Sequence, residues 1–167
     1  RLTEGLGRDF LMRAIVHKPT PACVFAQAPI QAALRLLDEG ELDPSGIEAI
    51  EVETTAKAIG FPGCDHPGPF PDGTSRQQSI QFGVAVVLAS GGIEERHWNE
   101  PPGPAIARLA SGCRLAPIEA GGDPARQPVS LTVRLRGGEI RRAAVPDFRS
   151  MSEEEVMGRF LAVGEAV

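Results

Sequence analysis

The sequence contains no tyrosine and a single tryptophan, and aromatic residues make up only 5% of its 167 residues. Basic residues are also in the minority, since 17 Lys and Arg stand against 22 Asp and Glu, and the net charge is −5. The arginines are scattered and form no basic stripe with aromatic residues between them, which a nucleic-acid surface requires. The composition therefore predicts no nucleic-acid partner.

Long apolar runs are missing as well. The longest candidate, residues 80–89, is about half the roughly 18 residues that a membrane span needs, so we expect no membrane partner. With 42% hydrophobic and 23% charged residues, the chain is predicted to be a soluble globular domain over residues 1–167. Its start has neither an initiator Met nor an apolar signal segment, so we expect a further part upstream.

Cysteine is scarce, and the three cysteines lie far apart at positions 23, 64 and 113. They form neither a disulfide framework nor a CxxC motif, and reduced thiols favour a cytoplasmic location. The run Cys64-Asp65-His66 has two interpretations: a metal ligand set or nucleophile, or an incidental pair in a Gly/Pro-rich loop. We adopt the second and predict no metal site.

Lysine is scarcer still, because only Lys18 and Lys57 accompany fifteen arginines. Lys18 lies in the segment His17-Lys18-Pro19-Thr20-Pro21-Ala22-Cys23, where each proline favours extended geometry at the residue before it. A partly desolvated lysine can act as an acid or base, whereas arginine keeps its proton. Lys18 is therefore a candidate catalytic residue, and the alternative is a solvated loop lysine.

Apolar periodicity predicts four helices. They are expected at residues 28–39, from Thr74 or Ser75 to about residue 90, from Pro104 to about Gly112, and from Ser152 onward. The second has almost no charge beyond Arg76, which predicts a buried central helix. The last opens with the capping box Ser152-Glu153-Glu154-Glu155. Its predicted inner face is formed by Val156, Phe160 and Val163.

Alternation of apolar and polar residues predicts strands at residues 50–53 and 128–136. Gly137-Gly138 can form a tight turn, so residues 139–145 are predicted to return antiparallel as a hairpin. Residues 10–16 are expected to form a strand or extended segment. The Pro- and Gly-rich residues 60–73 predict a long loop, either a lid over a site or an ordered surface loop.

The predicted central helix begins with the polar run Ser75-Arg76-Gln77-Gln78-Ser79. Unpaired backbone N–H groups and the helix dipole favour an anion at such an end. Arg76, Gln77 and Ser79 are therefore candidate ligands of a substrate carboxylate. Plain capping and solvation of the helix end, or an internal salt bridge of Arg76, are the alternatives.

Three segments together resemble the C-terminal half of the MmgE/PrpD family, in the right order and separation. They are Lys18-Pro19-Thr20-Pro21-Ala22-Cys23, the run from Ser75 to Ala85, and Met151-Ser152-Glu153-Glu154-Glu155-Val156 with Arg159-Phe160. The resemblance implies an α+β domain with an antiparallel β-sheet packed against helices, preceded by a lead-in at residues 1–22. It also implies that the family's N-terminal helical domain is absent from this chain.

The family includes 2-methylcitrate dehydratase, so the resemblance implies part of a bacterial lyase of propionate metabolism. Such an enzyme acts on a small polycarboxylate without a cofactor, in a cleft between the two domains. The role of the family's motif lysine passes to Lys18, as base or as a cation that stabilises the developing anion. The helical domain, in cis or in trans, is the implied partner, homodimer formation is left open, and the isolated chain is expected to be inactive.

Two positions depart from the family pattern. Thr20 stands where tyrosine is usual, and Ala26-Gln27 stand where a Thr-His pair is common. These changes point to a different substrate or to a decarboxylase, isomerase or epimerase of the same family. A non-catalytic interaction module remains the other class. An exposed apolar face for the helical domain would favour the enzyme, and a charged, self-contained surface would favour the module.

Overall fold

The computed structural model describes residues 7–8, 10, 15–118 and 126–165 of the chain. These residues belong to two compact units, which are considered separately. The main unit comprises Thr20–Arg149, and the terminal unit comprises Arg1–Pro19 with Ser150–Val167. Most of the strand predicted at residues 10–16 lies outside the described residues, and Phe10, Ile15 and Val16 themselves are not in a strand.

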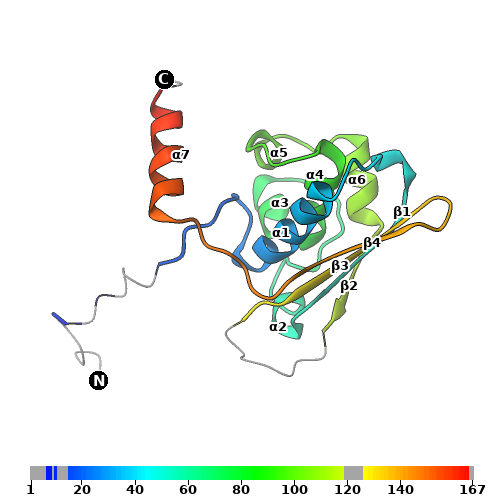
Figure 1. Ribbon diagram of the computed structural model, residues 1–167, viewed down its shortest axis with the longest axis horizontal. Helices are drawn as coiled ribbons and strands as arrows, with labels where there is room; N and C mark the ends of the chain where they lie inside the picture. Colours follow the sequence, from blue (N-terminus) through cyan, green and yellow to red (C-terminus); the bar gives the residue numbers. More distant parts are fainter. Residues whose placement is uncertain (1–6, 9, 11–14, 119–125, 166–167) are drawn as a thin grey trace. The chain divides into compact units, whose positions relative to one another are not determined.

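The main unit contains a four-stranded sheet in the order β2-β1-β3-β4 (Figure 1). The strands are β1 Ile47–Thr54, β2 Cys113–Pro117, β3 Val129–Leu135 and β4 Ile140–Val145. Pairing is antiparallel between β1 and β3 and between β3 and β4, as predicted. The prediction of a purely antiparallel sheet is wrong at β2, which pairs parallel to β1 because several helices connect the two strands as a crossover.

The hairpin between β3 and β4 confirms the strongest strand prediction. Gly137 and Gly138 both have φ of 89°, a conformation that residues with a Cβ rarely adopt. The backbone N–H of Leu135 donates to the Glu139 carbonyl at 2.8 Å, which closes the turn. The register pairs Val129 with Val145 at the far end.

Seven helices and one 3₁₀ turn occur among the described residues. They are α1 Val24–Asp38, the turn η2 Pro44–Gly46, α2 Ala56–Ile59, α3 Gly73–Gln78, α4 Ile80–Ser90, α5 Arg96–Asn99, α6 Pro104–Ser111 and, in the terminal unit, α7 Glu153–Glu165. Helix α1 begins earlier than predicted and contains Pro29, and α6 agrees with its prediction. The long loop predicted from Gly60 is present and leads into α3.

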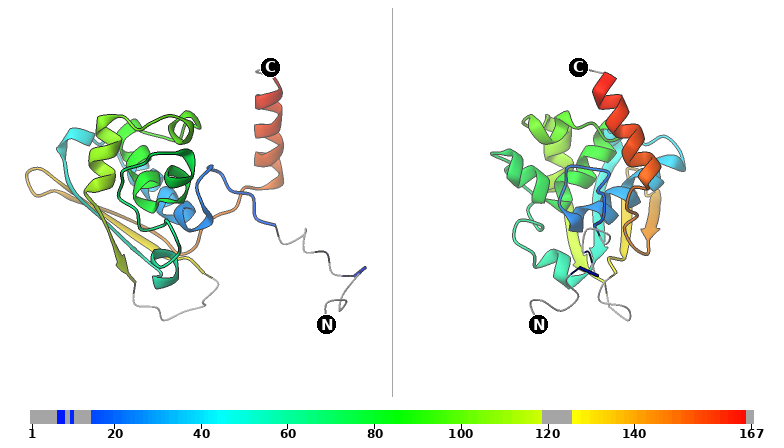
Figure 2. Two further views of the ribbon diagram at one scale, coloured as in Figure 1. Left: turned by 180° about the vertical axis from the view of Figure 1, so that it is seen from behind. Right: turned by 90° about the vertical axis from the view of Figure 1, so that its left-hand side faces the viewer.

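Helix α4 is the centre of the main unit, as its composition predicted. All its residues from Ile80 to Leu88 are buried, and α1 and α6 pack against it. Helix α1 also packs on β3 and β4, so the helices cover one face of the sheet (Figure 2). Inward strand residues such as Val52 and Leu131 are fully buried, whereas Glu51 on the opposite face is exposed.

Helices α1 and α4 approach closely at Gly83. A Cβ at this position would lie 2.7 Å from Cδ1 and 2.9 Å from Cγ1 of the buried Ile30. Real Cβ atoms do not come so close to a neighbour, so only glycine allows this spacing. The absence of a side chain at Gly83 therefore sets how closely α1 and α4 pack.

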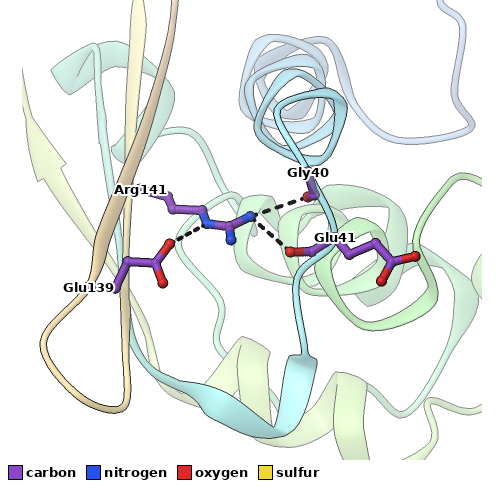
Figure 3. Close-up of polar contacts among 4 residues, drawn as sticks. All are labelled: Gly40, Glu41, Glu139 and Arg141. Carbon is purple, nitrogen blue, oxygen red and sulfur yellow. Dashed lines mark hydrogen bonds and ion pairs between the residues drawn. The ribbon is translucent and has the colours of Figure 1, made fainter.

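Arg141 joins the end of α1 to strand β4 (Figure 3). Its Nη1 donates to the carbonyls of Gly40 and Glu41 at 3.2 and 2.9 Å, and its Nε donates to Glu139 at 2.8 Å. Gly40 and Glu41 belong to the segment that follows α1, which ends at Asp38, so Arg141 fixes the exit from this helix to the sheet. Arg35 of α1 adds a second link, donating to the Ala144 carbonyl at 2.8 Å.

Candidate functional site

Lys18 is exposed and lies in the terminal unit, between two residues whose backbones are hydrogen-bonded. On one side, the His17 N–H donates to Ser150 Oγ at 2.9 Å. The Met151 N–H donates to the His17 carbonyl, also at 2.9 Å. His17 is therefore fixed to the segment that precedes α7.

Pro19, on the other side of Lys18, is hydrogen-bonded to a side chain of α7. Arg159 donates from Nη1 to the Pro19 carbonyl at 3.0 Å. Helix α7 begins with the predicted capping box, in which the Glu155 N–H donates to Ser152 Oγ and the Ser152 N–H donates to Glu155 Oε2. The prolines and α7 together fix the backbone on both sides of Lys18.

The polar run before the central helix is arranged differently from the prediction. Residues 73–90 form two helices, because Ser79 has φ −68° and ψ 125° and ends α3 while capping α4. The N-cap of α3 is Asp72, not Thr74 or Ser75, and hydrogen bonds from Ser75 hold the pKa of the Asp72 carboxyl below its usual value. We refer to residues 76–81 as the α3–α4 junction.

Arg76 lies inside the main unit and is only 5% exposed. Its guanidinium donates to three backbone carbonyls, those of Trp98 at 3.0 Å, Asn99 at 3.3 Å and Phe70 at 3.4 Å. Phe70 ends the long loop, and Trp98 and Asn99 belong to α5. Arg76 therefore ties two irregular segments to α3.

Ser79 is also buried, and both functions of its hydroxyl are used within the main unit. Ser79 Oγ donates to the His66 carbonyl at 2.6 Å and accepts from the Phe82 N–H at 2.9 Å. Gln77, in contrast, has an exposed side chain, while its carbonyl accepts from the Cys23 N–H at 2.7 Å. Of the three predicted carboxylate ligands, Arg76 and Ser79 are buried, and Gln77 is the one whose side chain is exposed to solvent.

Thr20 and Gln27, two positions that depart from the family pattern, form one buried hydrogen-bonded group. Thr20 Oγ1 donates to Gln27 Oε1 at 3.1 Å, and Gln27 Nε2 donates to the Ala22 carbonyl at 2.8 Å. Gln27 thus holds the proline segment against the first turn of α1. The sequence showed Gln27 only as a departure from the Thr-His pair of the family, and no local signal indicates this structural role.

The side chains of Asp65 and His66, in the run Cys64-Asp65-His66, contact other groups of the main unit. His66 Nε2 contacts the Pro69 carbonyl at 2.8 Å, and Asp65 Oδ1 accepts from Gln81 Nε2 at 2.6 Å. Within residues 7–8, 10, 15–118 and 126–165, no three His, Cys, Asp or Glu side chains are grouped to hold a metal ion. Gln81, which sequence reasoning passed over, connects this loop to α4.

The predicted site residues therefore fall into two groups. Arg76, Gln77 and Ser79 are brought together at the α3–α4 junction of the main unit, and Lys18 is fixed within the terminal unit. In the part of the chain that the structure describes, no helix has the length and apolar character to cross a membrane.

The fold and these contacts define an α+β domain that presents a lysine on a proline-stiffened segment. Residues 20–164 match the model of the MmgE/PrpD C-terminal domain, and the chain belongs to the MmgE/PrpD family. A search among curated proteins gave no match. The family and the C-terminal domain expected from the sequence are thereby confirmed.

Proposed function

We propose that the chain is the C-terminal part of a cofactor-free lyase that acts on a small polycarboxylate. Lys18 removes a proton next to a substrate carboxylate, or stabilises the anion that forms. The electron pair left on carbon forms the C=C bond as the C–O bond breaks, and the hydroxyl group takes up a proton from protonated Lys18 or from solvent and leaves as water. The observation that carries this proposal is the fixed backbone of His17 and Pro19 around an exposed lysine. A catalytic group must be positioned before the reaction begins, and this arrangement positions Lys18.

In this proposal, Gln77 binds substrate directly through its exposed side-chain amide. Arg76 and Ser79 donate their polar hydrogens to backbone carbonyls, so they contribute by fixing the α3–α4 junction that carries Gln77. The substrate we propose is 2-methylcitrate or a related tricarboxylate, which places the enzyme in bacterial propionate metabolism. The cytoplasm is the proposed location, because the three cysteines form no structural disulfide framework.

The exposed apolar side chains favour an enzyme half over a self-contained module. Among the described residues of the terminal unit, six large hydrophobic side chains are 50–72% exposed: Phe10, Ile15, Val16, Met157, Phe160 and Leu161. Single exposed apolar residues are ordinary on a protein surface. Here both α7 and the N-terminal segment of the same unit carry several of them, which indicates a surface that another domain covers. We propose that the family's helical domain, in cis or in trans, covers this surface. A homodimer contact is the alternative occupant.

The test is proton exchange at the substrate in the two-domain form, in which this chain is joined to the family's helical domain. We expect deuterium from D₂O to enter 2-methylcitrate, or its product, next to a carboxylate. NMR spectra of the substrate and product measure this exchange. Dehydration yields an unsaturated product, decarboxylation yields carbon dioxide, and epimerisation yields inverted substrate, so the product separates the three activities. Absence of exchange and of turnover across family substrates would favour the interaction module.

A further inference from the structure

Two of the three cysteines lie side by side in the main unit. Cys23 Sγ and Cys64 Sγ are 3.5 Å apart, although the residues are 41 positions apart in the sequence. Cys23 is partly exposed at the N-cap of α1, and Cys64 is fully buried in the long loop. Neither residue is used in the proposed function.

The backbone on both sides of this thiol pair is fixed by the α3–α4 junction. The Cys23 N–H donates to the Gln77 carbonyl at 2.7 Å, and the Ile80 N–H donates to the Cys64 carbonyl at 3.0 Å. Cys23 Sγ also contacts the Gln78 carbonyl at 3.4 Å. The proximity of the two sulfurs therefore follows from the packing of three segments, not from a chance rotamer of one exposed side chain.

We propose that Cys23 and Cys64 form a reversible disulfide, with a small-molecule disulfide as oxidant. A disulfide has an S–S distance of about 2.05 Å, so the sulfurs must approach by roughly 1.5 Å. Cys23, the accessible thiol, loses a proton and attacks the small disulfide, which releases one small thiolate. Cys64 then loses its proton and attacks the Cys23 sulfur, and the second small thiolate leaves. The two protons given up by the protein thiols are taken up by the two small thiolates. Two protein thiols are oxidised, and one small disulfide is reduced to two thiols.

The order of attack follows from the surroundings of the two sulfurs. The hydrogen bond with Cys23 and burial both raise the pKa of the Cys64 thiol, which makes Cys64 a poor first nucleophile. The resulting disulfide would join the long loop to the start of α1, five positions after Lys18. Cys113 provides an internal control, because burial raises the pKa of its thiol to about 12 and keeps it protonated.

The test exposes the 167-residue chain to buffers of oxidised and reduced glutathione, followed by unfolding, alkylation, trypsin digestion without reduction, and mass spectrometry. The three cysteines fall in different tryptic peptides, because Arg13, Arg35, Lys57, Arg76, Arg108 and Arg114 separate them and trypsin does not cut before Pro19. We expect a linked peptide pair that contains Cys23 and Cys64, with Cys113 alkylated throughout. Reduction should restore alkylation of both linked cysteines.

Two variants sharpen this test. In Cys64→Ala, Cys23 should retain a mixed disulfide with glutathione because no second thiol displaces it. In Cys113→Ala, the link between Cys23 and Cys64 should form as in the unmodified chain. Two results would overturn the proposal. In the first, Cys23 carries glutathione while Cys64 is still alkylated after unfolding. In the second, both thiols remain unchanged. Both of these outcomes are read in the unmodified chain, so they do not depend on a variant folding.

Discussion

Lys18 is flanked on both sides by residues whose backbones are held, and this predicts what its replacement would do. In the two-domain enzyme, Lys18→Met should lower the rate constant of the chemical step by about 10²- to 10⁴-fold, the usual effect of one acid–base or anion-stabilising group. The rate is measured under single-turnover conditions. Lys57→Met is the matched control, because it removes the other lysine of the chain and should leave the rate unchanged. Nearly full activity in Lys18→Met would make Lys18 a solvated loop residue.

Lys18→Arg separates the two roles proposed for this residue. Arginine keeps the positive charge but does not give up its proton near neutrality. Recovery of most of the rate would assign Lys18 to anion stabilisation, and a rate as low as that of Lys18→Met would assign it to proton transfer. The pH–rate profile adds a second readout, because the limb that reports a lysine base should disappear in Lys18→Arg.

Arg76 predicts a large effect on stability. Arg76→Ala should lower the free energy of unfolding by about 3 kcal/mol or more, because it leaves the carbonyls of the buried residues Phe70 and Trp98 without their donor. Arg96→Ala is the control. Its ion pair with Glu94 is more than half exposed and should contribute about 1 kcal/mol or less. Urea unfolding measures both, and a small loss in Arg76→Ala would contradict the structural role.

Arg76 also shows where sequence reasoning about single residues ended. The sequence placed a polar cluster at the start of a buried helix, and the structure has polar residues there. The sequence did not reveal that the guanidinium of Arg76 points inward, since its partner carbonyls at Trp98 and Asn99 lie more than twenty positions away along the chain. The same limit applied to Gln27, whose buried hydrogen bonds depend on how the proline segment folds back.

At the scale of the elements, the contact between α1 and α4 can be tested at Gly83. Gly83→Ala should destabilise the domain by about 1–3 kcal/mol, because the new Cβ meets Ile30, which is buried and has no room to move. Gly158→Ala in α7 is the matched control. Nothing lies within 4 Å of its Cβ position, so alanine should be neutral or stabilise by up to about 1 kcal/mol.

A second substitution tests whether Ile30 is the cause of this effect. Ile30→Val removes Cδ1, the atom closest to the methyl group that Gly83→Ala introduces. The double variant should therefore lose less stability than the sum of the two single losses, as thermal or urea unfolding would show. Strict additivity would mean that the close approach of the two helices does not determine the effect.

Elements formed by local signals were predicted well. The β3–β4 hairpin combines clean alternation with Gly137-Gly138, and the start of α7 combines serine and glutamate in a capping box. The break between α3 and α4 was missed, because residues 73–79 are polar or glycine and carry no apolar pattern that could mark a boundary at Ser79, where the backbone leaves the helical conformation. Strand β2 was missed because it is short and ends in proline, and because its extended conformation is stabilised by hydrogen bonds to the distant strand β1.

At the scale of the whole molecule, the apolar surface of the terminal unit predicts dependence on a second domain. The 167-residue chain alone should not turn over 2-methylcitrate, because a site built from two domains loses its geometry and its exclusion of water when one is missing. Adding the family's helical domain in trans should restore dehydration, measured as formation of the unsaturated product. Turnover by the lone chain would refute this prediction.

The same surface can be disrupted without altering the fold of the chain. Phe160 is 72% exposed, so Phe160→Glu should keep the circular-dichroism spectrum and melting temperature but weaken restoration by the helical domain at least about tenfold. Ile140→Glu is the control, since Ile140 is an exposed apolar residue of β4 in the main unit. Equal effects of the two substitutions would place the docking surface elsewhere.

The parallel pairing of β1 with β2 has a consequence for the order in which the chain folds. The β3–β4 hairpin closes over a two-glycine turn, whereas β1 ends at Thr54 and β2 begins only at Cys113. Bringing distant segments together costs more chain entropy before any contact compensates it, so the hairpin should form early and β2 late. In stopped-flow measurements, Val133→Ala should mainly slow folding, and Leu115→Ala should mainly accelerate unfolding. The opposite assignment would show that the crossover forms first. With the expected order, the nascent domain passes through a state in which the β3–β4 hairpin is formed before β1 has paired, so the free edge of β3 is open to the β1 of a second chain.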